Sequence, residues 1–314
     1  MKYLPNYRNL GISEEKVFDY FMSSLKDSII TWSYFTDFKK VKDNVKPIEI
    51  ELAILNTLIG KENLEPEFIK ILKEYPKVRL VLPILIALRK EHTKNLNVIC
   101  NLETFEAQNM GELFDPNIPL TKELEAKLIV FLKESGLKAF LKDKHLKNIV
   151  DYCYGVEVGL DSNGRKNRTG TIMESLVEKL LQKQFEASAD YVIAAQVSAS
   201  TIKDKFGVTV NFGRNEKGKE RRIDFVLFKK SSGMIYAIET NAYMGGGSKL
   251  KATAGEYEIL NRIIAPQKNV KFIWITDGQG WYTTKEPLKE AFLKLDYIFN
   301  LKMIEDGILR SVVE

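Results

Sequence analysis

Two hydrophobic patterns divide the chain near residue 160. Before that point, apolar residues recur at spacings of three and four, which is typical of amphipathic helices. The segments that this spacing predicts to be helical are 14–32, 48–59, 67–75, 122–135 and 137–154. The first half of the chain is therefore expected to be mainly α-helical.

After residue 160, predicted strands alternate with predicted helices. The strands are expected near 191–198 and at 222–228, 234–240 and 270–276, and the helices at 172–185, 249–264 and 286–295. The strand, helix and strand from 234 to 276 form a crossover unit, whose two strands should be parallel. The pattern predicts an α/β fold class, with a helical region over 1–155 and a sheet flanked by helices over 156–314.

Two acidic residues lie near the ends of neighbouring predicted strands. Asp224 belongs to the strand at 222–228 and Glu239 to the strand at 234–240, with a hairpin turn between them. Because side chains alternate faces along a strand, Glu239 extends an otherwise apolar row and shares its face with Asn241. An isolated carboxylate on a buried face is costly, so this one needs a cation or a metal as a partner.

The spacing of these acids has two interpretations. Carboxylate oxygens suit Mg²⁺, which takes one or two carboxylates together with water and phosphate oxygens and can activate a water for phosphodiester hydrolysis. Ion pairs with Arg221 or Arg222 would produce the same pattern. On spacing alone, both interpretations remain open.

Composition excludes several classes of protein. The 314 residues are 45% hydrophobic and 28% charged, as in ordinary soluble globular proteins. The longest apolar run, 80–88, is too short to span a bilayer, and residues 1–11 lack the apolar segment of a signal peptide, so we expect a cytoplasmic protein. Two cysteines and two histidines are too few for a disulfide framework and make a zinc site hard to assemble.

Basic residues gather just before the predicted site elements. Residues 201–230 hold nine Lys and Arg against four acids, a local charge of +5 that equals the net charge of the whole chain. The segment 161–170 adds Arg165, Lys166 and Arg168 against one acid. A polyanion that passes the carboxylates would meet these side chains, although a solvated surface loop would have the same composition.

Two further motifs have structural alternatives. Glu174, at the margin of the apolar stripe of helix 172–185, could aim a third carboxylate at the site, but Thr171 and Glu174 also match a capping box, which we favour. The glycine run 245–247 is not a nucleotide P-loop, because Ser248 precedes Lys249 and no Ser or Thr follows it. A turn into a helix capped by Ser248 explains the run, and the helix amides could hold a DNA phosphate.

Several longer motifs resemble the type II restriction endonucleases of the DpnII/MboI kind. The motifs are TWSYFTDFKKV (31–41), GVEVGLDSNGRKNRTG (155–170), MESLVEKLL (173–181), RRIDFVLF (221–228), IETNAY (238–243), GGGSKL (245–250) and WITDGQGWY (274–282). The resemblance implies a restriction-endonuclease-like, mixed β-sheet core of the PD-(D/E)xK class. It also implies a bacterial enzyme that uses Mg²⁺ to cut double-stranded DNA at unmethylated GATC, on the 5′ side of the G.

The resemblance assigns roles to individual residues. Asp224 and Glu239 correspond to the two acids of the class and would hold the metal with the backbone carbonyl of Thr240, Glu174 being an auxiliary ligand. The lysine of the class falls at Asn241, whose amide can orient water or phosphate but carries no charge. Lys249, at the start of the next helix, is the candidate for the missing charge.

DNA recognition is expected to come from basic and amide side chains. The candidates for contacts to bases or phosphates are Asn163, Arg165, Lys166, Asn167, Arg168, Arg221 and Arg222. Because GATC is palindromic, a two-fold homodimer would place one site on each strand. A companion adenine methyltransferase would protect the host's DNA.

Two other functions compete with this one. A DNA-binding protein whose nuclease site has decayed at Asn241 is the first, although the presence of both Asp224 and Glu239 argues against it. A nucleotide-dependent transferase using the glycine run is the second, and the absence of a P-loop motif argues against that.

Overall fold

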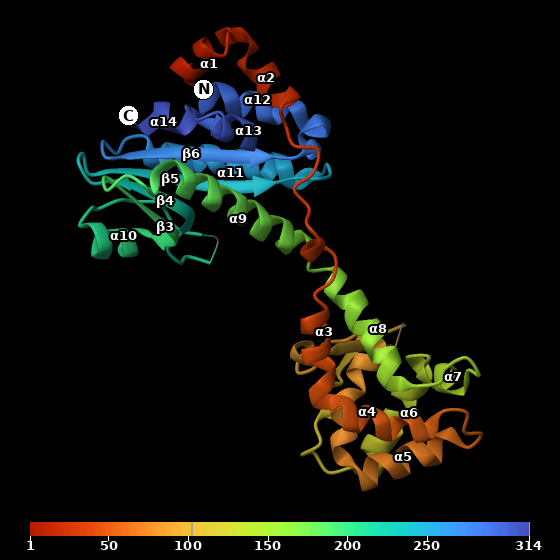
Figure 1. The fold of residues 1–314 in the computed structure, drawn as a ribbon. Coiled ribbons are helices and arrows are strands. Elements are labelled where there is room, and N and C mark those ends of the chain that lie inside the picture. The colour runs from red at the N-terminus through yellow and green to blue at the C-terminus, as the bar shows by residue number, and fades with distance from the viewer. Residues whose placement is uncertain (102, 216, 314) are drawn as a thin grey trace. The chain divides into compact units, whose positions relative to one another are not determined.

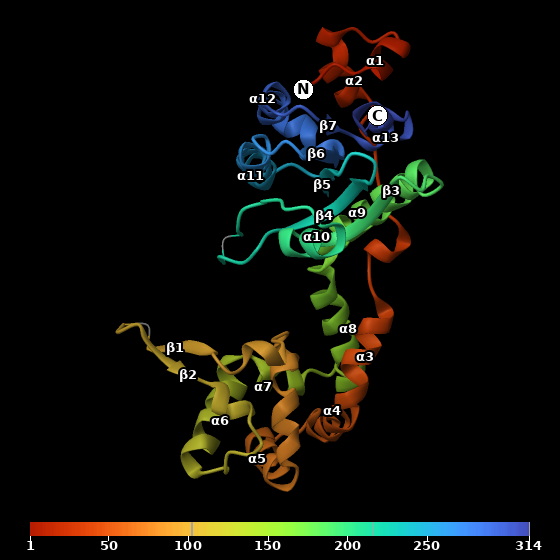
Figure 2. The same cartoon turned by 90° about the vertical axis from the view of Figure 1, so that its left-hand side faces the viewer.

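The protein was analysed as a computed structural model, which describes residues 1–101, 103–215 and 217–313 (Figures 1 and 2). The chain forms two compact units, one from residues 1–34 and 166–314 and the other from residues 35–165. The sequence placed a single boundary at 155/156, but the first 34 residues join the later unit. They do so because Tyr7 and Phe21 are fully buried in its core and the backbone N–H of Lys26 donates to the carboxylate of Asp277 at 2.7 Å.

The first unit is built on a mixed sheet. In the described part of this unit the strand order is β3-β4-β5-β6-β7, antiparallel from β3 to β5 and parallel from β5 to β7. The strands are β3 (Tyr191–Ser198), β4 (Arg222–Lys229), β5 (Met234–Ala242), β6 (Val270–Asp277) and β7 (Ile298–Phe299). The predicted α/β class, the hairpin and the parallel crossover are confirmed.

Helices cover both faces of this sheet. Figure 2 shows α11 and α12 on one side and α9 and α13 on the other. The helices of this unit are α1 (Pro5–Asn9), α2 (Val17–Ser23), α9 (Arg165–Phe185), α10 (Ala199–Phe206), α11 (Ser248–Ile264), α12 (Lys285–Lys294), α13 (Leu301–Glu305) and α14 (Ile308–Val313). Neighbouring residues of β6 such as Ile273 and Trp274, which point to opposite faces, are both fully buried because both faces of this strand are covered.

The second unit is mainly helical and has its own core, which includes Leu52, Leu58 and Leu128. Its helices are α3 (Phe38–Val45), α4 (Glu49–Leu55), α5 (Leu64–Glu74), α6 (Lys122–Glu134), α7 (Leu137–Lys142) and α8 (Ile149–Ser162). The sequence did not predict its hairpin of β1 (Asn97–Asn101) and β2 (Glu106–Asn109). The strands of this hairpin are largely exposed, so they lack the alternation that marks a half-buried strand.

Two predicted helices are shorter than expected because local hydrogen bonds compete with the helix. The helix predicted at 14–32 ends at Ser23, where the hydroxyls of Ser23 and Ser24 donate to the carbonyl of Tyr20. The helix predicted at 137–154 is interrupted between α7 and α8, where Asn148 caps the second helix by accepting from the N–H of Val150. Across the described residues, no helix combines the length and the apolar character that crossing a membrane requires.

Candidate active site

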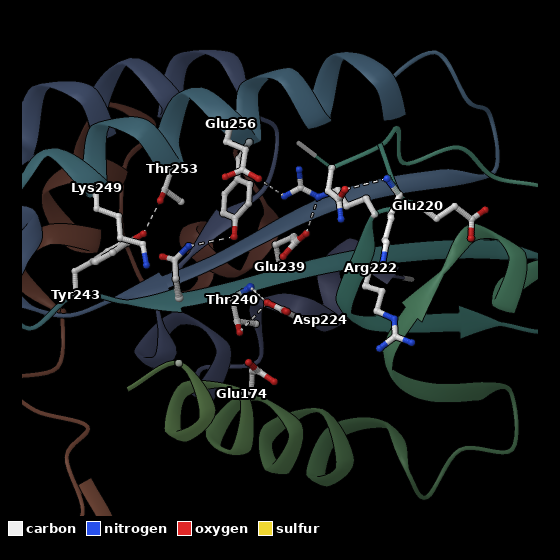
Figure 3. Close-up of a pocket in the computed structure, with 16 residues that line it drawn as sticks. Glu174, Glu220, Arg222, Asp224, Glu239, Thr240, Tyr243, Lys249, Thr253 and Glu256 are labelled. Atoms are coloured by element: carbon white, nitrogen blue, oxygen red, sulfur yellow. Dashed lines mark hydrogen bonds and ion pairs between the residues drawn. The ribbon is translucent and has the colours of Figure 1, made fainter. Parts of the chain in front are cut away.

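The predicted acids meet in a pocket at the start of β4 and the end of β5, between α9 and α11 (Figure 3). The pocket has a volume of about 770 Å³. The predicted site residues that line it are Glu174, Arg221, Arg222, Asp224, Glu239, Thr240, Asn241 and Lys249. Residues that are far apart in the sequence are thus brought together as the paired strands predicted.

Asp224 is held by hydrogen bonds from two other strands. The ladder between β4 and β5 ends at the pair Phe225 and Ile238, so the backbone N–H of Thr240 is left to donate to Asp224 Oδ2 at 2.8 Å. The side-chain amide of Gln196, on β3, donates to Asp224 Oδ1 at 3.2 Å. These bonds fix the orientation of the carboxylate toward the pocket.

Glu239 is a buried carboxylate beside a second one. Glu239 is 5% exposed. Its burial, and to a smaller extent the negative charge of Asp224, raises the pKa of Glu239 to about 8. Arg221 opposes this rise, because its Nε donates to Glu239 Oε1 at 3.2 Å. Among the described residues Arg221 pairs with Glu239 but not with Asp224, so the two neighbouring carboxylates keep negative charge that a divalent ion would offset.

Arg221 is held in place by several contacts within the protein. Its Nη2 also pairs with Glu256 Oε1 at 2.9 Å, and its guanidinium lies 5.8 Å from the centre of the Tyr257 ring. Its side chain is 17% exposed. The ion pair between Arg221 and Glu239, which was the alternative to a metal site, is therefore present in the structure. Arg222 is exposed at the rim of the pocket.

Asn241 has a fixed amide. Thr276 Oγ1 donates to Asn241 Oδ1 at 2.6 Å, and the buried Trp281 donates in turn to Thr276 Oγ1 at 2.8 Å. The amide nitrogen, Nδ2, is then directed to Tyr257 Oη at 3.4 Å. Asn241 therefore presents a hydrogen-bond donor to the pocket, as a lysine would, but without a charge.

Glu174 lies in the middle of α9 and not at a helix start. Because α9 begins at Arg165, the capping box expected from Thr171 and Glu174 is wrong, and Thr171 Oγ1 instead donates to the carbonyl of Asn167 at 3.3 Å. Glu174 Oε2 accepts from Gln196 at 3.2 Å, the same amide that binds Asp224. Burial, and then the charge of Asp224, raises the pKa of Glu174.

None of the described side chains of the basic segment 163–168 lines this pocket. The segment forms the end of α8 and the start of α9 instead of a loop. Arg165 lies 6.0 Å from the ring centre of Phe35, and Arg168 Nε donates to the carbonyl of Tyr34 at 2.8 Å. Asn163 and Asn167 are exposed, and the side chain of Lys166 lies outside what the structure describes.

Lys249 lies in the first turn of α11, is exposed, and lines the pocket beside Tyr243 and Thr253 (Figure 3). The expected Ser248 cap is wrong, because Ser248 is the first helical residue and Gly247 takes the cap position with no side-chain bond. Gly247 has φ 151°, a conformation that favours glycine, and its carbonyl accepts from the N–H of Leu250 at 3.2 Å.

Three residues that contact the predicted acids or Arg221 were missed by the sequence analysis. Glu256 and Tyr257 follow Lys249 by seven and eight residues, so their helical spacing put them on its face and could have revealed them. Gln196 gave no such signal. Its backbone has φ 52°, a left-handed conformation that strand periodicity does not predict.

A dense cluster of metal ligands is absent from the described residues, where no three His, Cys, Asp or Glu side chains gather closely enough to hold an ion. A site that uses Asp224 and Glu239 would therefore complete its shell with backbone oxygen and water. Mg²⁺ binds in this way, since it keeps several waters and needs few carboxylates.

The sequence was compared with known proteins. A model of the DpnII restriction endonuclease family matches residues 17–311. The chain is 44% identical to the type II restriction enzyme MjaIII of Methanocaldococcus jannaschii, over 94% of this chain and 99% of that one. It is 34% identical to the type II restriction enzyme DpnII of Streptococcus pneumoniae, over 96% of this chain and 100% of that one. It is 38% identical to the type II restriction enzyme MboI of Moraxella bovis, over 90% of this chain and 92% of that one.

Proposed function

Because this chain belongs to the DpnII family of type II restriction endonucleases, we propose that it cuts double-stranded DNA at unmethylated 5′-GATC-3′, before the G, with Mg²⁺. The chain is an enzyme, a site-specific deoxyribonuclease that acts on DNA. The observation that carries the proposal is the family match itself, which spans both pocket carboxylates, Asp224 and Glu239.

The residues of the pocket fit a divalent ion. Two close carboxylates, one of them buried and with a raised pKa, favour a cation beside them. Asp224, Glu239 and the backbone carbonyl of Thr240 would hold Mg²⁺, and Glu174 would support it through the shared amide of Gln196. When bound, the ion supplies Lewis acidity that activates water and neutralises phosphate charge.

The proposed reaction is an in-line hydrolysis. A water oxygen forms a bond to phosphorus, the bond from phosphorus to the 3′ oxygen breaks, and a proton from the water ends on that 3′ oxygen. The products are a 5′-phosphate and a 3′-hydroxyl. Asn241 donates from its fixed amide to the water or to the phosphate, and Lys249 adds a positive charge on the α11 side of the pocket.

DNA would be bound by the basic residues around and beyond the pocket. Arg222 at the rim is suited to phosphate contacts. Asn163, Arg165, Lys166, Asn167 and Arg168 are proposed to contact bases or phosphates near the start of α9. Because the proposed target is palindromic, the enzyme would act as a homodimer, and an adenine methyltransferase would protect the host's own sites.

Digestion of two plasmids tests this function. One plasmid is methylated at the adenine of every GATC and the other is unmethylated, and both are incubated with Mg²⁺ before their ends are sequenced. We expect cutting before the G in the unmethylated plasmid alone. Equal cutting of both plasmids would disprove the methylation claim, and ends at other sequences would disprove the GATC claim.

The variant Asp224→Ala is the control for the site. It removes one proposed ligand from a half-buried position, and we expect no cleavage above background while GATC duplex binding in Ca²⁺ persists. Cleavage that survives this change would refute the site assignment. Wild-type protein that binds GATC duplex but never cuts it with Mg²⁺ would favour the inactive DNA-binding alternative.

A further inference from the structure

The carboxylates of the site carry a negative charge, and the position at which the class has a lysine holds no cation in this chain. Two residues after Glu239 the chain has Asn241, a neutral amide that is held by Thr276. Hydrolysis of a phosphodiester concentrates negative charge on the phosphate oxygens, and fixed donors or cations that face them are the largest source of catalysis in such sites. A cation must therefore come from another element.

The basic residues that line the pocket are Lys219, Arg221, Arg222 and Lys249. Among the described residues, Arg221 is the one of these four that pairs with a proposed metal ligand, through Nε and Glu239 Oε1 at 3.2 Å. Lys249 and Arg222 are exposed and have no ion pair in the described part of the chain.

Arg221 is anchored independently of Glu239. Glu256, on α11, accepts from its Nη2 at 2.9 Å, and the guanidinium packs against the ring of Tyr257 at 5.8 Å. A guanidinium has five N–H donors in a rigid fork, so these two ion pairs leave donors for another acceptor. Tyr257 also meets the amide of Asn241, which places Arg221 and Asn241 around one ring.

We propose that Arg221 supplies the positive charge that Asn241 cannot, by donating to a non-bridging oxygen of the scissile phosphate. This inference rests on the proposed nuclease function. Without DNA, Arg221 occupies the carboxylate of Glu239, and Glu256 keeps the guanidinium in the pocket once Glu239 turns to the cation. Arg221 is then a catalytic residue and not a contact that only adds DNA affinity.

The variant Arg221→Ala tests both parts of this proposal. We expect it to bind Mn²⁺ in the absence of DNA more tightly than the wild type, as measured by electron paramagnetic resonance, because Glu239 is released. We also expect single-turnover cleavage of a GATC duplex to slow by at least about 100-fold. Millimolar guanidinium should restore part of this rate, and urea at the same concentration should not.

A structural role gives different results. If the ion pair merely fills the site, Arg221→Ala binds Mn²⁺ more tightly and cleaves within about threefold of the wild type, which overturns the proposal. A slow variant that guanidinium does not rescue also overturns it. If Arg221→Ala does not fold, Arg221→Gln takes its place, because it keeps the hydrogen-bonding length without the charge, and cleavage within about threefold of the wild type by that variant would overturn the proposal.

Arg262→Ala is the matched control. Arg262 lies on the same helix as Glu256, is 76% exposed and pairs with Glu258, so its loss should change neither Mn²⁺ binding nor cleavage.

Failure of the nuclease function can be told apart from failure of this inference. Wild-type protein that does not cut GATC DNA refutes the former, whereas an active Arg221→Ala variant refutes only the role of Arg221.

Discussion

Glu239 couples the stability of the metal-free protein to pH. Its pKa is about 8 in the folded chain, whereas the ordinary pKa of a glutamate side chain is 4.5, so between these values the folded state keeps a proton that the unfolded state has lost. Raising the pH from 5 to 8 without metal should therefore lower the free energy of unfolding, by at most about 1.4 kcal/mol per pH unit. Urea unfolding in EDTA measures this slope. Glu239→Gln should reduce it. A slope unchanged by Glu239→Gln would contradict the prediction.

The hydrogen bonds of Asn241 lead to a second prediction, which concerns stability and cleavage. Asn241→Ala removes the acceptor of the Thr276 hydroxyl beside the buried Trp281, and leaving a buried donor unsatisfied costs about 1–3 kcal/mol. Thermal or urea unfolding should show this loss, together with slower cleavage. Thr276→Ser, which keeps the hydroxyl, should retain most of the stability. If Asn241→Ala is as stable as the wild type, Thr276 does not hold the amide.

At the scale of elements, β3 joins α9 to β4 through one strained residue. Gln196 has φ 52° in β3, a conformation that costs a non-glycine residue roughly 1 kcal/mol, and its amide binds both Glu174 and Asp224. We expect Gln196→Gly to relieve the backbone strain yet slow cleavage, because both carboxylates lose their shared donor. Ala87→Gly, at φ 56° in the other unit, is the control and should gain stability with unchanged cleavage. A Gln196→Gly variant with full activity would refute the bridging role.

The elements also show where sequence patterns have predictive power. Strand β3 matches its prediction at 191–198, although Val197 is the one buried residue of this strand. The parallel pairing of β5 with β6 follows from the helix that connects them, because such crossovers obey a fixed handedness rule. The start of α9 was missed since the apolar stripe begins at Ile172, whereas residues 165–171 are polar apart from Gly170. That error turned an interior residue, Glu174, into an apparent cap.

At the scale of the molecule, the change of pattern near residue 160 gives no sign that the first 34 residues belong with residues 166–314. Amphipathic spacing shows that a helix has an apolar face, and it does not show which core that face joins. The pairing of Asp224 with Glu239 was predictable because a hairpin brings neighbouring strands together. The contact of Arg221 with Glu256 was not, because it joins the segment before β4 to a helix that follows β5.

The separate cores predict that residues 35–165 fold alone. This unit buries its own apolar residues, among them Leu52, Leu58 and Leu128, each fully buried within the unit. A domain of this length can bury enough surface to be stable without a partner. The excised fragment should therefore unfold cooperatively in urea, as followed by circular dichroism. Leu128→Ala in the fragment should cost about 2–5 kcal/mol and shift the transition to lower urea. A fragment with no cooperative transition would mean that the core of this unit depends on the rest of the chain.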